Sequence, residues 1–205
     1  MHTELIHPLI QHKLALMRDK TTGVKLFREL TGEITRLLAF GALRDLPTRE
    51  VEVATPLATA KCRVLEGEIV LVPILRAGLG MLDAMADVVS GAHVAFLGMF
   101  RDHDTTTPVE YYTNIPPATP NSTAVVLDPM LATGGSASAA VSVLKRKGFE
   151  RIVFVCIIAC PEGIAKFEGE HPDVPVFTAV IDDKLNDKKY IMPGLGDAGD
   201  RLFGT

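Results

Sequence analysis

Apolar and polar positions divide the chain into short apolar runs and stretches of helical spacing. Continuous apolar runs at residues 69–75, 125–127, 152–158 and 176–181 are typical of strands buried on both faces, and the run at 94–100 predicts a further strand. Helical spacing separates several of these runs. Strands that alternate with helices predict a parallel sheet, wound right-handed and flanked by helices on both faces. The predicted fold class is therefore α/β.

The N-terminal part of the chain has its own pattern. Apolar residues at helical spacing over 9–17 and 24–40 predict two packing helices, and the pieces 51–53 and 59–64 predict two short strands. We find no internal repeat, low-complexity tract or linker. A chain of 205 residues can bury one substantial core, so we expect a single domain over residues 1–205.

The stretch 125–148 predicts a strand, a loop and a helix in direct succession. Gly134, Gly135 and Ser136 lie where the chain must turn tightly and then begin the helix. The first N–H groups of a helix lack internal partners, and the positive end of the helix dipole points the same way. Such a helix start attracts anions, so this stretch predicts a phosphate site.

Three charged residues follow strand runs directly, and parallel strands bind ligands at their carboxyl ends. By this rule Arg76, Arg101 and Asp128 share one edge of the sheet. Taken singly, Asp128 could merely cap its loop, and Arg76 could form a surface pair with Asp83 or Asp87. Together with the helix start they favour a site for a sugar carrying several phosphates, because arginines bind phosphate bidentately and a carboxylate accepts hydrogen bonds from ribose hydroxyls.

Two common nucleotide-binding motifs are excluded. No Lys follows Gly134 and Gly135, so the phosphate loop of nucleoside triphosphatases is absent. Residues 194–199 match Gly-x-Gly-x-x-Gly, but only six residues follow Gly199, and we expect that neither a helix nor a returning strand fits there. We expect a tight turn that exposes backbone groups instead.

Composition narrows the classes of partner. The 21 Lys and Arg residues against 25 Asp and Glu give a net charge of −4, which provides no broad basic field for nucleic acid or a membrane surface.

The N-terminus lacks the pattern of a secretory signal, and Cys62, Cys156 and Cys160 form no Cys-x-x-Cys pair. We expect a cytoplasmic protein in which Cys156 and Cys160 are small buried hydrophobes. A mean hydropathy of +0.24 points to apolar surface buried between subunits, hence to a homo-oligomer.

Three stretches together resemble the uracil phosphoribosyltransferase family. They are LRAGLGM at 75–81, VLDPMLATGGS at 126–136 and YIMPGLGDAGDR at 190–201, in the order of the family and spread over most of the chain. Phosphoribosyltransferases usually have two adjacent acids at the position of Asp128. Here the second is Pro129, which matches the uracil branch and leaves Asp128 alone to bind the ribose. The resemblance implies the type I phosphoribosyltransferase fold with a C-terminal base-binding hood.

The resemblance also implies an activity. The family transfers phosphoribose from 5-phospho-α-D-ribose 1-diphosphate (PRPP) to N1 of uracil, giving UMP and diphosphate in pyrimidine salvage. Mg²⁺ is the implied cofactor, carried by PRPP rather than by a metal site of the protein. Dimers or larger assemblies are expected, and activation by GTP, which occurs in some relatives, is left open. The rival readings, a nucleic-acid-binding regulator and transfer to a purine or orotate, are disfavoured by the net charge and by residues 190–201 respectively.

Site residues carried over by position form three overlapping sets. The implied catalytic residues are Asp128, Arg76 and Arg101. The implied PRPP-binding residues are Arg76, Arg101, Asp128, Pro129, Met130, Leu131, Ala132, Thr133, Gly134, Gly135, Ser136 and Asp197. The implied uracil-binding residues are Ile191, Gly196, Asp197 and Ala198, acting mainly through backbone groups. No histidine lies in the three stretches, and none is given a catalytic role.

Overall fold

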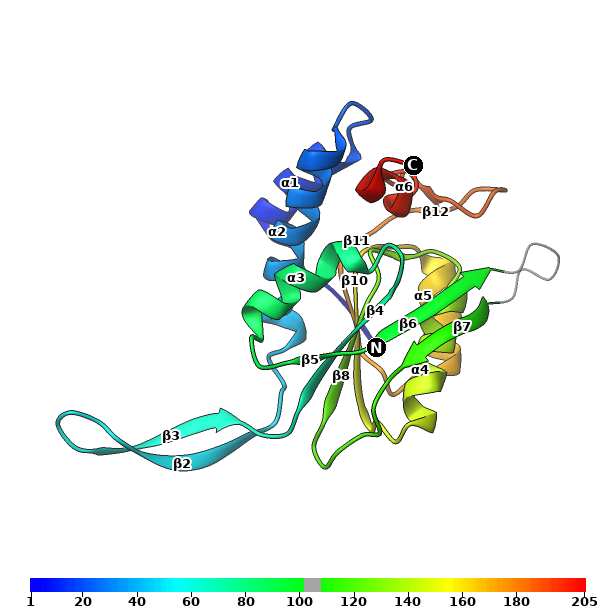
Figure 1. Cartoon of the computed structure of the whole chain (residues 1–205). Helices are drawn as coiled ribbons and strands as arrows, with labels where there is room; N and C mark the ends of the chain where they lie inside the picture. Colours follow the sequence, from blue (N-terminus) through cyan, green and yellow to red (C-terminus); the bar gives the residue numbers. More distant parts are fainter. Residues whose placement is uncertain (102–107) are drawn as a thin grey trace.

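A mostly parallel sheet lies at the centre of the protein (Figure 1). The computed structural model describes the backbone of residues 1–101 and 108–205, and the side chains of residues 1–98 and 112–205. In spatial order the strands are β1 (His2–Glu4), β11 (Val176–Ile181), β10 (Arg151–Ala159), β8 (Thr123–Leu127), β4 (Ile69–Leu75), β6 (Phe96–Arg101) and β7 (Pro108–Asn114). The β6–β7 pair is antiparallel and the other pairs along this path are parallel. The predicted α/β class is confirmed.

The predicted strand at 94–100 is divided in two. The short β5 (His93–Val94) and β6 both pair with β4 at a constant offset, Val70 with His93 and Ile74 with Leu97. The carbonyl of Leu71 accepts from Ala95 on this side, so by alternation Pro73 faces the same neighbour. Proline has no N–H to donate, which interrupts the ladder between the two pieces.

Helices cover both faces of the sheet, and each face has its own core. The helices are α1 (Pro8–Arg18), α2 (Val24–Ala42), α3 (Leu79–Val88), α4 (Gly135–Arg146), α5 (Pro161–Glu170) and α6 (Ala198–Phe203). Successive strand residues point to opposite faces, so Leu71 joins the core beneath α1, α2 and α3, whereas Val70 and Val72 join the core beneath α4 and α5. This two-sided burial explains why the central strands are continuous apolar runs.

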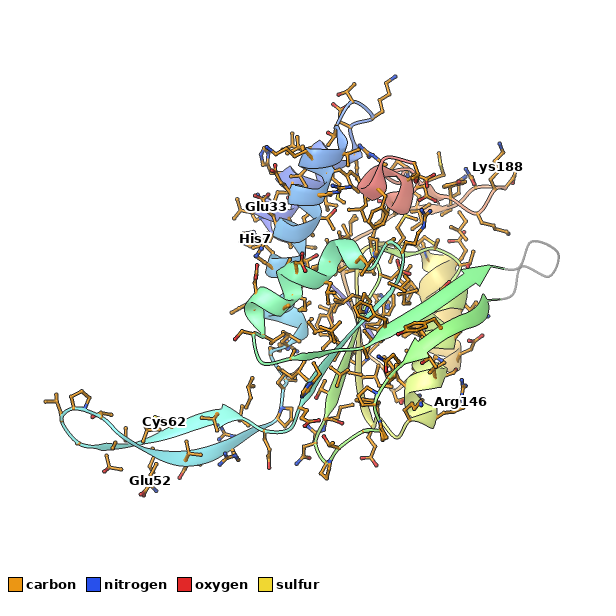
Figure 2. The ribbon with its side chains drawn as sticks, in the orientation of Figure 1. His7, Glu33, Glu52, Cys62, Arg146 and Lys188 are labelled. Carbon is orange, nitrogen blue, oxygen red and sulfur yellow. The ribbon has the colours of Figure 1, made fainter. Side chains whose placement is uncertain are left out.

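The first two helices lie where the spacing predicts them. Phe27 and Ile34 on α2 are fully buried in the core beneath α1, α2 and α3. His7 caps α1, because its Nδ1 accepts a hydrogen bond of 3.1 Å from the N–H of Leu9 (Figure 2). Cys156 and Cys160 are buried, as predicted, and all three cysteines are free. None of the described helices combines the length and apolar character that crossing a bilayer requires.

Two parts lie outside the central layers. The hairpin of β2 (Thr48–Ala54) and β3 (Thr59–Leu65) extends away from the sheet, and Figure 2 shows Glu52 and Cys62 on it. Residues 184–203, which we call the hood, lie beyond the carboxyl ends of the strands and contain β12 (Lys184–Leu185), β13 (Ile191–Met192) and α6. The expectation that no helix fits after the turn is wrong. Six residues suffice for α6, because the Asp197 side chain accepts from the N–H of Asp200 at 3.0 Å and begins the helix.

Candidate active site

Residues 128–136 connect β8 to the first turn of α4; they are the first part of the site, and we call them the phosphate loop. Gly134 has a φ of +77° and directly precedes Gly135, the first residue of α4. A Cβ on Gly134 would lie 2.9 Å from the carbonyl oxygen of Gly163. Both the left-handed backbone and this close approach require glycine. The sequence prediction of a tight turn followed by a helix start at this place is confirmed.

Unpartnered backbone donors line the phosphate loop. Among the described residues, nothing accepts a hydrogen bond from the N–H groups of Gly135, Ser136 and Ala137. Asp128 and residues 130–137 surround a pocket of about 150 Å³ beside these donors. Pro129 instead anchors the loop to β10, since its carbonyl accepts from Ile157 and Ile158, each at 3.0 Å. Donors at the start of a twelve-residue helix make this pocket suited to a phosphate group.

Helix α5 supports the phosphate loop from behind, and sequence reasoning missed it. A Cβ on Gly163 would lie 2.4 Å from the carbonyl oxygen of Ala132 and 2.5 Å from that of Leu131. The Sγ of Cys160 also donates to the Ala132 oxygen at 3.1 Å. The only sequence signal was a glycine inside a helical pattern, where glycine costs about 1 kcal/mol relative to alanine and often has a packing reason.

Asp128 lies at the inner end of the phosphate loop, partly buried. Its Oδ1 accepts a hydrogen bond of 3.2 Å from the N–H of Met130, so the loop-capping role is present. Burial raises the pKa of the Asp128 carboxyl from 3.8 to about 7, against the opposing effect of the Met130 hydrogen bond, and the charge of Asp197 raises it further. The negative charge of Asp197, in the hood, thus acts on the carboxyl of Asp128 at the sheet edge.

The loop after β4 brings Arg76 to the same edge. Gly78 makes this possible, because a Cβ there would lie 2.3 Å from the carbonyl oxygen of Leu127. The exposed Arg76 guanidinium lies 3.8 Å from the Asp200 carboxylate and 6.0 Å from the centroid of the Phe203 ring. The alternative of a surface pair with Asp83 or Asp87 is wrong, since Arg76 pairs with the hood and Asp87 pairs with Arg36.

Arg101 is the last residue of β6, the strand next to β4. Its backbone therefore ends at the same edge of the sheet as Arg76. Its side chain lies outside the described residues, so its role stays a prediction.

The hood brings the remaining predicted residues over this edge. Ile191 and Ala198 are buried, whereas Gly196 is exposed and Asp197 is partly so. Among the described residues, nothing accepts from the N–H groups of Gly196, Asp197 and Ala198. A Cβ on Gly199 would lie 3.9 Å from the Cβ of Ala77, so the hood turn and the Arg76 loop are neighbours. Figure 2 shows Lys188 at the outer end of the loop between β12 and β13.

A phosphate cradle at the carboxyl edge of a parallel sheet, facing a hood, defines the class of the protein as a type I phosphoribosyltransferase. A hypoxanthine phosphoribosyltransferase structure from Staphylococcus aureus shares the fold, with a TM-score of 0.52 at 12% identity over 78% of this chain and 75% of that one. The AQ2163 protein from Aquifex aeolicus is much more similar, with a TM-score of 0.92 at 39% identity, covering 100% of this chain and 99% of the other.

Sequence comparisons give the family. Residues 4–205 match the family model for uracil phosphoribosyltransferase. The uracil phosphoribosyltransferase of Dictyoglomus thermophilum is 56% identical over 200 residues, 97% of each chain. That of Clostridium perfringens is 52% identical over 204 residues, 99% of this chain and 98% of the other. The chain belongs to the uracil phosphoribosyltransferase family, which confirms the resemblance of its three sequence stretches.

Proposed function

We propose that the protein transfers phosphoribose from PRPP to N1 of uracil, giving UMP and diphosphate in pyrimidine salvage. The observation that carries this proposal is the presence, at the carboxyl edge of the sheet, of two sets of backbone donors without partners among the described residues, one in the phosphate loop and one at residues 196–198 of the hood. The first suits a phosphate and the second suits a small planar base. Membership of the family supports the same reaction. The three free cysteines fit a reducing compartment, and we propose the cytoplasm.

Each part of PRPP has a proposed partner at this edge. The 5′-phosphate binds at Thr133–Ser136, where the start of α4 offers its N–H groups. The ribose hydroxyls donate to Asp128, and Arg76 and Arg101 bind the diphosphate. The ion pair of Arg76 with Asp200 is exposed, and such pairs contribute about 0–1 kcal/mol, so the diphosphate can displace the Asp200 carboxylate from Arg76. Asp197 also faces PRPP.

The proposed chemistry is a substitution at C1 of the ribose. The bond from C1 to the diphosphate oxygen breaks, the bond from C1 to uracil N1 forms, and the N1 proton is released. Positive charge develops on the ribose ring and negative charge on the departing diphosphate. The ionised Asp128 carboxylate would stabilise the former and the two arginines the latter, because charged groups bound to PRPP before the bond breaks oppose the charges that develop. No histidine is required as a base.

The donor set of the site fits Mg²⁺ that arrives on PRPP. The described residues contain no cluster of three or more His, Cys, Asp or Glu side chains that could hold a metal ion. Asp128 and Asp197 each offer one carboxylate at this edge of the sheet. Mg²⁺ commonly takes one or two carboxylates and fills its other positions with substrate phosphates and water. Bound in that way, the ion would neutralise charge on the diphosphate.

Backbone groups of the hood would select the base. Uracil presents an N3–H donor between two carbonyl acceptors, whereas cytosine presents an acceptor at N3 and an amino donor at position 4. The backbone at residues 196–198 cannot exchange its donors for acceptors. A turn that satisfies uracil therefore leaves cytosine with unpaired polar groups, which discriminates by a factor of roughly 10⁴.

Diphosphate release by the purified protein tests the proposed function. The assay contains PRPP, Mg²⁺ and one base at a time: uracil, cytosine, orotate, adenine, guanine or hypoxanthine. We expect uracil to support the reaction and the others to support little. Repeating the uracil reaction with and without GTP tests activation by GTP, which rests on the resemblance to the family alone. Release that requires a purine or orotate, and not uracil, would overturn the proposal.

Self-association is a further part of the proposal. Leu57, between β2 and β3, is 96% exposed, and Phe40 on α2 is 89% exposed. Large apolar side chains this exposed on a protruding hairpin and a helix end are typical of surfaces that bury against another subunit. Light scattering coupled to size-exclusion chromatography should give the mass of a dimer or larger assembly, and the mass of a single chain at all concentrations would contradict this.

A further inference from the structure

An ion pair outside the substrate pocket joins two segments that are far apart in the sequence. Arg18 is the last residue of α1, and Asp182 follows β11 directly. The Nη1 and Nη2 atoms of Arg18 donate to Oδ2 and Oδ1 of Asp182 at 2.7 and 2.5 Å. The Asp182 side chain is 4% exposed and that of Arg18 25% exposed. This is a bidentate and largely desolvated pair, the geometry in which arginine binds a carboxylate most strongly.

Both members of the pair also hold the main chain of Gly194. Arg18 Nη1 donates to the Gly194 carbonyl oxygen at 2.7 Å, and the Gly194 N–H donates to Asp182 Oδ2 at 2.8 Å. Gly194 has a φ of +67°, and a Cβ there would lie 2.0 Å from the Ile191 carbonyl oxygen. The residue is thus fixed on both its donor and its acceptor side by side chains of distant segments.

Gly194 begins the turn of the hood, residues 194–199, that is proposed above to bind uracil. Only Leu195 separates it from Gly196, whose N–H belongs to the unpartnered set at residues 196–198. Rotation of the main chain at Gly194 would change the direction of the N–H groups of residues 196–198 relative to the sheet. The phosphate pocket, by contrast, is lined by Asp128 and residues 130–137, and the hydrogen bonds of the Arg18 and Asp182 side chains go to each other and to Gly194 instead.

We propose that Arg18 and Asp182 are positioning residues for the base: they fix the Gly194 peptide and so aim the backbone groups that recognise uracil. The inference rests on the proposed function of the same site. Stability alone accounts poorly for such a pair, because well-packed apolar residues often replace a buried ion pair at no loss of stability. A fixed direction for three backbone groups is something that an apolar contact does not supply.

Variants of each partner test the positioning role. Asp182→Asn keeps the shape but places an amide where a carboxylate oxygen accepts from Arg18 or Gly194. Arg18→Lys keeps the positive charge but has a single donor nitrogen, so it cannot bind Asp182 through two nitrogen atoms as the guanidinium does. Arg18→Met removes the charge and all donors. Steady-state kinetics should show KM for uracil raised by about 10- to 100-fold, since misdirected backbone groups weaken one or two hydrogen bonds to the base. KM for PRPP should change less than about threefold, and Arg18→Lys should lie between Arg18→Met and wild type.

A matched control comes from the same helix. Lys13 on α1 forms a 2.7 Å pair with Glu33 on α2, away from the hood. Lys13→Met should leave both KM values unchanged. If Asp182→Asn or Arg18→Met does not fold, judged by far-UV circular dichroism and thermal unfolding, Arg18→Lys decides the question.

The outcomes separate the inference from the proposed function. Wild-type protein that releases no diphosphate with uracil would overturn the proposed function before any variant is made. An active wild type whose Arg18 and Asp182 variants keep a normal KM for uracil would overturn the positioning role alone. Equal rises in KM for uracil and for PRPP would also overturn the positioning role. They would show that the variants disturb the whole site and not the binding of uracil alone.

Discussion

Replacing Asp128 by asparagine should raise stability and lower activity together. The folded protein holds the Asp128 proton with a pKa of about 7, against 3.8 for the ordinary carboxyl. Because the folded state binds this proton more tightly than the unfolded chain, the free energy of unfolding falls as pH rises between these values and levels off above about pH 7. A difference of about three units corresponds to roughly 4 kcal/mol, and relaxation of the site makes that an upper limit. Asparagine carries no charge, so Asp128→Asn avoids this penalty.

Thermal unfolding at two pH values measures the effect. At pH 8 the variant should be more stable than wild type by roughly 2–4 kcal/mol, and 2 kcal/mol alone raises Tm by about 4–8 °C in a chain of this size. At pH 5 the advantage should shrink by about half or more, because the wild-type carboxyl is then protonated in the folded state. Asp187→Asn, the same change at an exposed position of the hood, should shift stability by less than about 0.5 kcal/mol.

Activity should move the other way. The uncharged amide loses hydrogen bonds from ribose hydroxyls to a charged acceptor, worth about 1.5–3 kcal/mol, or roughly 10- to 150-fold in kcat/KM for PRPP. In wild type this constant should rise with pH through about 7, as Asp128 ionises in the free enzyme, and the rise should be missing in the variant. A variant that is no more stable than wild type at pH 8, with an unchanged pH profile, would refute the reasoning about Asp128.

Three other changes test other parts of the site. Gly163→Ala places a Cβ 2.4 Å from the Ala132 oxygen, so KM for PRPP should rise and Tm should fall; Gly169→Ala, in the same helix with open space around it, should be neutral or stabilising by up to about 1 kcal/mol. Arg76→Lys should lower kcat/KM for PRPP by about tenfold or more, because lysine cannot bind the diphosphate bidentately; an unchanged value would remove Arg76 from the site. With the wild type, cytosine should react roughly 10⁴-fold less efficiently than uracil, and comparable rates would contradict recognition by fixed backbone groups.

Sequence reasoning worked where a local pattern has one physical meaning. A strand buried on both faces must be apolar throughout, so 69–75 and 176–181 were predicted to the residue. The helix start after Gly134 was predicted because a tight turn and unpaired donors need small residues there. The division of 94–100 followed from Pro73 in the neighbouring strand, and the support of the phosphate loop by Gly163 depends on a helix some thirty residues away. Neither the division of residues 94–100 nor the support of the phosphate loop by α5 can be predicted from the sequence of those segments alone.

The hood also depends on contacts that a local sequence pattern cannot predict, and the shortness of its elements explains why. Its two strands have two residues each and α6 has six, so it has little apolar surface with which to build a core of its own. Four of its residues, Ile191, Leu195, Ala198 and Leu202, therefore pack into the core beneath α1, α2 and α3. Guanidinium groups that donate to main-chain oxygens add to this packing: Arg18 to Gly194 at 2.7 Å, Arg28 to Leu202 at 2.5 Å, and Arg201 to Met17 and Asp19, each at 2.6 Å. All four bonds join residues that lie between 174 and 184 positions apart in the sequence. Single arginines have no periodicity, so nothing in the sequence marks them as anchors. Arginine donors fix carbonyl oxygens on both sides of the turn, so its backbone is held rigidly. The N–H groups of residues 196–198, which have no acceptor among the described residues, stay free to bind a ligand. A rigid backbone with free donors can recognise a base without help from side chains.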